Sequence, residues 1–421
     1  MKTKQVFILQ ILAIAAIVTS CNSPTGPVNN SLTLSAEVSC TEAWLSLSAN
    51  NITLPRNVTI TRDGSSLFNF TLTTKDTTLY DSTLAPNKSY TYQALLSPLG
   101  GQSDKIVATT LDTTSHNFSW QTFTFGDPGA GSSILYDVAI INENNICAVG
   151  EFYKKDSTGQ IDPRLYNLLK WNGSKWSTQR VFFTNNRGQT FLAPILSIFV
   201  FSQNDILLGM DQIIHWDGNN FKEYEISSTV FHSWINKIWG VSGQDFYIVG
   251  NDGNIAHYSS SNWQKLESGI TSQIYDIWGI DNSNFGKMIY CEAFDKLLKI
   301  DQQNVVSQIQ FPYNTYIYSI WFNGKHKFYG SGSGIYENSN NKWKSVDLFR
   351  DRAISKIRGT DYNNVFGAGT LGLIVHFNGY SWSVYNDVSQ GAYTSLSVKD
   401  NIIVAVGFNN GKAIITVGKR N

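Results

Sequence analysis

The sequence has little charge and no excess of either sign. Charged residues make up 15% of the 421 positions, and Lys plus Arg equals Asp plus Glu at 32 each. A chain without a net field cannot steer towards nucleic acid or an anionic membrane surface by long-range attraction. The composition therefore argues against polyanion binding, and we expect no nucleic-acid partner.

Cysteine is also scarce, and the residues that chemistry would need are scattered. Cys40, Cys147 and Cys291 lie on separate strand-like segments, which gives neither a disulfide framework nor metal-ligand spacing. The six histidines are dispersed, and no Gly-rich phosphate loop leads from a strand into a helix. We therefore predict buried thiols, no metal and no cofactor, and we assign no catalytic residue. An active site assembled from distant loops remains an alternative.

One long apolar run is present, at the N-terminus. Lys2 and Lys4 precede the run from Val6 to Val18, which small residues and Cys21 follow. This order is typical of a signal peptide, and the run is too short for a stable membrane span. The tetrad Val-Thr-Ser-Cys resembles the lipobox of bacterial lipoproteins. That resemblance implies that Cys21 becomes the mature N-terminus and carries a lipid such as palmitate.

We accordingly predict a signal peptide at residues 1–20 and a flexible tether at residues 21–30, which contain Pro, Gly and Asn. An ordinary cleaved secretory signal is the alternative. Because Asn22 follows the lipidated position in place of a retention aspartate, we expect sorting to the bacterial outer membrane. Its periplasmic or cell-surface side stays open. The membrane is then a partner through the lipid, and we expect a monomer.

Residues 31–114 consist of short alternating runs broken by Gly, Pro, Asn and Asp, which predicts a β-sandwich. The segment LAPNKSYTY, from Leu84 to Tyr92, resembles the tyrosine corner of fibronectin type III domains. The resemblance implies that a Tyr hydroxyl bonds to backbone across the corner, and that the domain is a spacer. Trp44 departs from the family pattern because it lies at the start of its strand.

Residues 116–421 contain a repeat of about 40 residues. Each copy has an opening strand, such as NKIWG at 236–240, and a second apolar run; in most copies a tight turn such as Asn-Gly or Asp-Gly then joins a third strand to a fourth. The core position of the opening strand holds Val138, Ile198, Ile238, Ile277, Ile320, Ile357 and Leu396. This period predicts an all-β chain in which a seven-bladed β-propeller follows the sandwich.

The last repeat ends at its third strand, and the missing strand is found at the front of the propeller. The segment from Asn117 to Phe125 has no opening strand of its own and carries Trp120 at the blade-closing aromatic position. We predict that it pairs with the last repeat and closes the ring, which leaves no open sheet edge. The repeats resemble Trp-Gly-containing propellers of Bacteroidetes-like lipoproteins and, distantly, those of photosystem II assembly factors. This resemblance implies the fold and leaves the activity open.

Two groups of residues are candidates for ligand binding. The residue before each core position is polar in all seven repeats, and its charged members are Asp137, Lys237, Asp276 and Lys356. Strand alternation predicts a mixed-charge ring at the mouth of the central channel, either a ligand site or a solvated opening. The Trp residues that follow the core position, at 239, 278 and 321, are predicted to pack between blades.

The second group lies in loops on the same face, where insertions in the first repeat also fall. Its members are Arg187, His232, Trp234, Tyr313 and Tyr316. Exposed aromatics beside polar groups suit the stacking and hydrogen bonding of sugars, and they also anchor proteins. Our leading hypothesis is thus a lipid-anchored envelope protein that binds a glycan or a partner protein. The alternatives are a propeller hydrolase or lyase acting on extracellular polysaccharide, and an envelope assembly factor.

Overall fold

The structure, a computed structural model, describes residues 31–97, 101–184, 188–283, 285–348, 352–386 and 388–421. The predicted signal peptide, tether and lipidated Cys21 lie outside these ranges, and so does Arg187. The described chain is almost entirely β, with one short 3-10 turn, η1 (Thr370–Gly372). No helix in the described ranges is long and apolar enough to cross a membrane.

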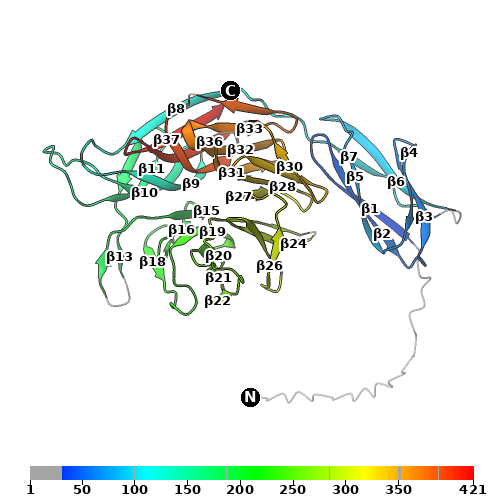
Figure 1. The fold of residues 1–421 in the computed structure, drawn as a ribbon, viewed down its shortest axis with the longest axis horizontal. Coiled ribbons are helices and arrows are strands. Elements are labelled where there is room, and N and C mark those ends of the chain that lie inside the picture. Colours follow the sequence, from blue (N-terminus) through cyan, green and yellow to red (C-terminus); the bar gives the residue numbers. More distant parts are fainter. Residues whose placement is uncertain (1–30, 98–100, 185–187, 284, 349–351, 387) are drawn as a thin grey trace, which may run out of the picture.

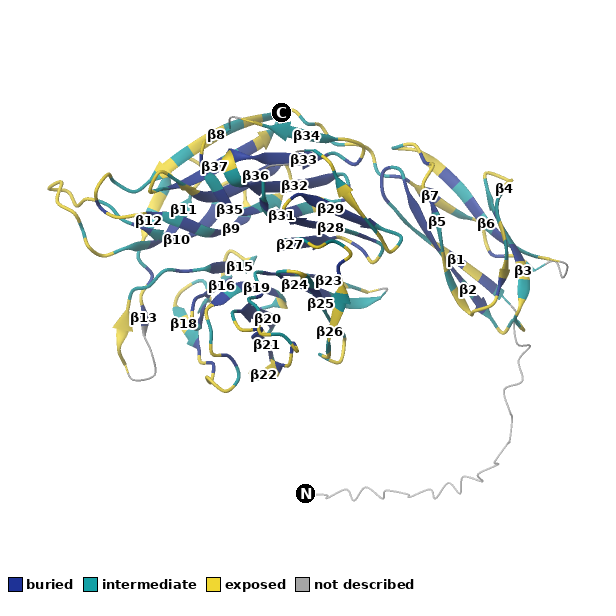
Figure 2. Cartoon of the chain, viewed as in Figure 1, coloured by how far each residue is buried: buried dark blue, intermediate teal, exposed yellow. Residues whose placement is uncertain are grey.

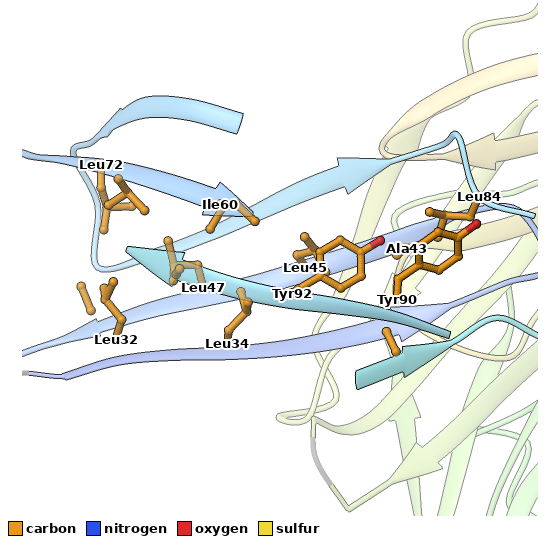
Figure 3. Packing of buried hydrophobic residues seen from close by; sticks show 14 residues of the cluster. Leu32, Leu34, Ala43, Leu45, Leu47, Ile60, Leu72, Leu84, Tyr90 and Tyr92 are labelled. Atoms are coloured by element: carbon orange, nitrogen blue, oxygen red, sulfur yellow. The ribbon is translucent and has the colours of Figure 1, made fainter. Parts of the chain in front are cut away.

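The first seven strands form two facing sheets, which lie to the right in Figure 1. One sheet has the order β1-β2-β5 and the other the order β4-β3-β6-β7. The strands are β1 (Ser31–Val38), β2 (Ala43–Asn50), β3 (Arg56–Arg62), β4 (Ser65–Leu72), β5 (Asp76–Asp81), β6 (Ser89–Ser97) and β7 (Ile106–Thr109). Alternate residues point inward, so Leu45, Leu47, Ile60 and Tyr92 meet in one apolar core between the sheets (Figure 3).

The predicted corner is present in this unit. The hydroxyl of Tyr90 accepts a hydrogen bond from the backbone N–H of Ala85 at 2.9 Å. Trp44, the departure from the family pattern, faces away from the sandwich core. Its ring stacks on His326 of the second unit with centroids 5.8 Å apart. The unusual position of this Trp therefore serves contact between the two units.

From residue 118 onward the chain builds seven further four-stranded antiparallel sheets. Their first strands are β9 (Ile134–Asn142), β15 (Ser197–Ser202), β19 (Ile235–Ser242), β23 (Asp276–Asn282), β27 (Ile317–Phe322), β31 (Ile354–Asp361) and β35 (Ala392–Lys399). Their second strands are β10 (Asn145–Phe152), β16 (Asp205–Gly209), β20 (Asp245–Gly250), β24 (Gly286–Ala293), β28 (Lys327–Gly332), β32 (Asn364–Gly369) and β36 (Ile402–Asn409).

The outer strands follow the same order. The third strands are β11 (Tyr166–Trp171), β17 (Ile213–Trp216), β21 (Ile255–Ser259), β25 (Lys296–Ile300), β29 (Ile335–Ser339), β33 (Ile374–Phe377) and β37 (Lys412–Arg420). The fourth strands are β12 (Trp176–Gln179), β18 (Phe221–Tyr224), β22 (Asn262–Leu266), β26 (Val306–Gln310), β30 (Lys342–Val346), β34 (Trp382–Tyr385) and, for the last sheet, β8 (Phe118–Phe125). A two-stranded hairpin, β13 (Phe183–Thr184) with β14 (Thr190–Phe191), lies between the first two sheets.

The first strands surround one axis. Each contacts the first strand of the next sheet, and β35 in turn contacts β9, which makes the arrangement circular. Figure 2 shows that buried residues concentrate in the inner strands. Trp239 and Trp321 are buried among neighbouring strands, as the sequence predicts, whereas Trp278 is only half-buried.

Strand β8 is separated from its partner by almost the whole second unit. It pairs antiparallel with β37, from Phe118 opposite Arg420 to Phe125 opposite Ala413. The sequence predicts this pairing. The indole of Trp120 lies directly over Gly418, where an added Cβ would come within 2.4 Å of the ring. Glycine at this position therefore allows Trp120 to reach Tyr385, with ring centroids 4.9 Å apart.

The sandwich is fixed to the circular unit by buried charges. Lys327 of β28 donates to Glu42 of the sandwich at 2.5 Å and contacts Glu337 of β29 at 2.8 Å. Burial alone would lower the pKa of Lys327, but the two carboxylates raise it above its ordinary value. Glu42 also accepts hydrogen bonds from the hydroxyls of Tyr80 and Ser339. The ammonium of Lys327 is therefore buried between carboxylates of both units, and separating the units would break one of its ion pairs.

Replacing Trp120 by Ala should weaken the closing strand. We expect a loss of about 3 kcal/mol in unfolding free energy, because a large ring leaves a partly collapsed cavity against Tyr385 and Gly418. Urea denaturation, followed by Trp fluorescence and circular dichroism, measures this loss of unfolding free energy. Gln121→Ala, at an exposed site on the same strand, provides the control. Equal stability of the two variants would show that β8 does not hold the last sheet.

Replacing Lys327 by Met should separate the two units. The change leaves buried Glu42 without a cation and leaves Glu337 only its longer contact with Lys344, at 3.4 Å. Breaking a buried ion pair by removing one partner costs about 3–5 kcal/mol. We expect faster protease cleavage between residues 111 and 118 and a larger radius of gyration by X-ray scattering. Lys342→Met removes an exposed lysine nearby and should change neither quantity. Unchanged scattering of the Lys327 variant would contradict the role of this ion pair.

Candidate functional site

The first strands bring the predicted polar ring together at the centre of the molecule. Its seven members, one from each first strand, are Asp137, Ser197, Lys237, Asp276, Ser319, Lys356 and Ser395, and all are buried. The expectation of a solvated opening is therefore wrong at this level of the channel. Buried charges are stable only when they are paired, and the side chains cross the axis to achieve this.

One half of this central cluster is built around Asp137. Lys237 donates to both carboxylate oxygens of Asp137, at 2.7 and 2.6 Å. The hydroxyl of Ser395 donates to the same carboxylate at 2.7 Å. Burial alone would raise the pKa of Asp137, but the charge of Lys237 and the hydrogen bonds lower it below its ordinary value. The Asp137 carboxylate is thus fully engaged.

The other half repeats this arrangement around Asp276 with one addition. The hydroxyl of Ser319 donates to Asp276 at 2.5 Å, and Lys356 donates to it at 3.0 Å. Arg358 occupies the bidentate position, with Nη1 and Nη2 at 2.9 and 2.6 Å from the two oxygens. The Ser-Asp-Lys group of the first three sheets therefore recurs in the next three, and Arg358 displaces the lysine from its second contact.

The positive charge of Lys356, the lysine that Arg358 displaces, is poorly compensated. Burial lowers the pKa of Lys356 to about 8, and the attraction of Asp276 recovers only part of the loss. Arg358 also lowers it by repulsion. Nearby, Glu292 of β24 is buried directly opposite Asp276, and its Oε2 has no hydrogen-bond partner among the described residues. Burial and the charge of Asp276 raise the pKa of Glu292 well above its ordinary value.

The central cluster forms the floor of a cavity of about 600 Å³ that opens at the face where the first strands begin. We call this surface the strand-start face and the hollow the channel-mouth cavity. Lys237 and Lys356 belong to its floor, and aromatic and polar residues form its wall. The wall residues used below are Tyr136, Asn236, Gln273, Tyr275, Tyr318 and Ser355.

A row of aromatic rings leads from this cavity to the surface. Tyr318 contacts Tyr275, Tyr275 contacts Phe294, and Phe294 contacts Tyr316, with centroid distances of 6.2, 5.5 and 4.8 Å. Tyr316 is 52% exposed. Phe294 adopts a left-handed backbone conformation, with φ of 63°, in the turn after β24. The carboxylate of Glu292 accepts the Phe294 N–H at 2.5 Å and so stabilises this uncommon turn.

A second hollow of about 430 Å³ lies on the same face, and we call it the Trp234 groove. It is lined by Asp211, Gln212, Ile226, Ser228, Phe231, His232, Ser233, Trp234, Asn251 and Asp252. Trp234 is 46% exposed. Asn236 of the channel-mouth cavity donates to Asn251 of the groove at 3.0 Å. The two hollows are therefore neighbours that share this amide pair as a wall.

The structure brings together some of the predicted loop residues and separates others. His232 and Trp234 line one groove, and Tyr316 ends the aromatic row. Tyr313 is a correction: it is half-buried, packs on Phe311 and Tyr336, and its hydroxyl donates to the carbonyl of Trp343 at 3.3 Å. Arg187 lies outside the described residues.

The opposite mouth of the channel is narrower, at about 170 Å³. Arg358 and Lys237 border it, together with Trp278 and Ser397. The guanidinium of Arg358 lies 4.8 Å from the ring centre of Trp278, a cation–π contact. Lys237 therefore contacts both hollows, and the central cluster separates them.

The histidines repeat one structural role. His215 and His257 each bond through Nε2 to an Asp at the start of the neighbouring strand, at 2.7 Å. His376 makes the equivalent contact with Asn364 at 3.2 Å. The part of the chain that the structure describes contains no group of three or more His, Cys, Asp or Glu side chains arranged to hold a metal ion.

Several important residues escaped the sequence prediction. Arg358 occupies the position that Trp holds in three other repeats, and this break in the pattern was a usable signal for a buried acid nearby. Except for Gln273, the wall residues stand one position before the polar ring, where the repeats read Tyr136, Leu196, Asn236, Tyr275, Tyr318, Ser355 and Thr394. Glu292 gave no signal, because its significance depends on the pairing of β24 with β23.

Comparisons with solved structures identify the fold. The structure described as "YCF48 bound to D1 peptide" is 13% identical with a TM-score of 0.55, and the match covers 73% of this chain and 99% of that one. The WD40 β-propeller domain of Doa1 is 10% identical, with a TM-score of 0.53 and coverage of 72% and 97%. U3-55K is 9% identical, with a TM-score of 0.53 and coverage of 73% and 99%.

These similarities, together with the circular arrangement of four-stranded sheets, show that the second unit is a β-propeller. At such low identity they establish the fold alone. No model of a protein family matches the sequence, and no curated protein matches it.

Acid should destabilise the protein through His376. Its Nδ1 lies 2.8 Å from that of His116, and burial together with the charges of His116 and Arg420 lowers the pKa of His376 to about 2. The unfolded chain takes up this proton below about pH 6.5, whereas the folded chain does not, so stability falls with pH below that value.

Between pH 6.5 and 5 this one group accounts for about 2 kcal/mol. Urea denaturation at both pH values measures the slope. His376→Gln should reduce the loss by that amount. Identical pH slopes for the two proteins would contradict the buried, neutral state of His376.

Proposed function

We propose that this protein is a lipid-anchored binding protein of the bacterial envelope, whose strand-start face binds a glycan or a partner protein. In this proposal Cys21 carries the lipid, and residues 31–114 form a fibronectin type III-like spacer. The seven sheets are the blades of one ring that β8 closes. The strand order of the sandwich and the Tyr90 hydrogen bond support the family assignment.

One observation carries the binding role. Two adjoining hollows on a single face combine exposed rings with polar groups that are not used by the protein itself. Among the described residues, the hydroxyls of Tyr275, Tyr318 and Ser355 and the amide of Gln273 have no hydrogen-bond partner, although all line the channel-mouth cavity. Concave sites with an apolar wall and a few convergent polar groups are typical of ligand binding.

The comparisons support the partner-protein form of this proposal. A solved propeller of similar fold is described as bound to a peptide. The exposed rings of Trp234 and Tyr316 support either form, because aromatic side chains stack on sugars and also anchor proteins. The enzyme alternative receives less support. Lys237 engages both oxygens of Asp137, and Arg358 engages both oxygens of Asp276, so neither carboxylate is free to act as a general base.

The buried contacts between the two units support a presenting role for the sandwich. The Glu42–Lys327–Glu337 ion pairs and the stacking of Trp44 on His326 hold one orientation of the propeller. In the proposed lipoprotein, the flexible tether would then move the sandwich and the propeller together, with the strand-start face in one orientation relative to the sandwich.

Trp234→Ala tests the proposal on the strand-start face. We expect the purified protein to retain selected glycans or peptides on printed arrays, and the variant to bind at least tenfold more weakly, as truncation of a central aromatic anchor does. Tyr380→Ala removes another exposed ring, 70% accessible, in the turn between β33 and β34, and should bind normally. Equal binding by all three proteins would overturn the assignment of this face.

A further inference from the structure

The two halves of the central cluster differ in one respect that bears on ligand chemistry. Lys237 uses two of its three ammonium hydrogens on Asp137. Lys356 uses only one on Asp276, because Arg358 takes the bidentate position. Two hydrogens of a buried ammonium are therefore left for a partner outside the protein, and Lys356 lines the channel-mouth cavity.

The charge count of the cluster points in the same direction. Lys237, Lys356 and Arg358 contact two carboxylates, Asp137 and Asp276. Burial and the charge of Asp276 raise the pKa of the neighbouring Glu292, which favours its neutral form. One positive charge is left over at the floor of the cavity. A single anionic group placed there would neutralise the floor and complete the hydrogen bonds of Lys356.

The wall indicates what else the ligand carries. The free hydroxyls of Tyr275, Tyr318 and Ser355 and the free amide of Gln273 surround the hollow. An apolar side chain would leave these groups unpaired when it displaced water, at a cost for each. A ligand with many hydroxyls would satisfy them, while the faces of the tyrosine rings pack on its carbon skeleton. A cavity of about 600 Å³ has room for one or two sugar residues.

We propose that the channel-mouth cavity binds the acidic terminal sugar of a glycan, with its carboxylate on Lys356 and its hydroxyls on the tyrosine, serine and glutamine wall. This inference rests on the proposed binding function and names its ligand class. The central cluster closes the far end of the cavity, so a chain end is bound there and not a chain interior. The next sugar lies across the Asn236–Asn251 pair, in the Trp234 groove.

Isothermal titration calorimetry with trigalacturonate and its carboxyl-reduced, neutral counterpart tests the proposal. We expect the acidic trisaccharide to bind at least tenfold more tightly than the neutral one. Ser355→Asp places a carboxylate in the wall of the cavity that Lys356 also lines, and should abolish this preference by repelling the ligand carboxylate. Ser397→Asp makes the same change at the opposite mouth of the channel and should retain it. Lys356→Gln should also lose the preference.

Folding is monitored independently, because Lys356 is part of the buried cluster. Ser355→Asp keeps every charge of the central cluster, so the melting temperature of this variant should not fall. If Lys356→Gln is unstable, the sugar preference of Ser355→Asp alone tests the proposal. Equal affinity for the acidic and neutral sugars, or an unaffected Ser355→Asp variant, would overturn the inference.

Two further arms separate this inference from the proposed function. A pentapeptide with a free C-terminal carboxylate, compared with its amide, tests the other carboxylate-bearing class. Carboxylate-dependent binding of the peptide alone would overturn the sugar assignment while leaving the strand-start face as the binding surface. An array ligand whose binding is lost in Trp234→Ala but unchanged in Ser355→Asp would overturn the proposed acidic-sugar site and leave the proposed binding face in place.

Discussion

Seven strands that converge on one axis leave a narrow channel, and the groups within it must satisfy one another. A buried charge without a partner costs several kcal/mol, far more than one surface contact contributes. The chain meets this constraint by placing Asp, Ser and Lys on three successive sheets, twice. Each carboxylate thereby reaches a hydroxyl from the next sheet and an ammonium from the sheet after it. Charges from sheets far apart in sequence thereby hold the ring together.

The same constraint applies where the sandwich meets the propeller. Lys327 of the propeller lies between Glu337 of the same unit and Glu42 of the sandwich, so separating the two units would break the buried Glu42–Lys327 ion pair. Trp44 adds a flat apolar contact beside it. A sandwich that was only a loose link to the propeller would not need such a contact. The buried joint converts the sandwich from a link into an arm with a defined direction.

The sequence was sufficient for the fold because each repeat carries the same local signals. These signals are short-range features, and their repetition allows them to be recognised in the sequence. Examples are the alternation around Ile238, the positive-φ turn at Gly173 and the single strand around Trp120. The polar ring could also be predicted, since its members share one position. Their burial could not, because it depends on Arg358 and on pairing across the axis. Tyr313 shows the same limit: a loop aromatic gives no local sign of the rings that will cover it.

Positions that depart from the repeat therefore mark candidate functional residues, because the repeated residues are sufficient to form the propeller. A strictly repeated cluster would give Lys356 the two contacts that Lys237 has, and the channel would be neutral and closed. Arg358 breaks the repeat, takes those contacts and leaves an ammonium facing the cavity under Tyr275 and Tyr318. This imbalance costs stability, because burial, together with repulsion by Arg358, lowers the pKa of Lys356 to about 8. In the proposed site an anion that enters the cavity would offset this cost, and the stability of the ring would then depend on whether the cavity is occupied.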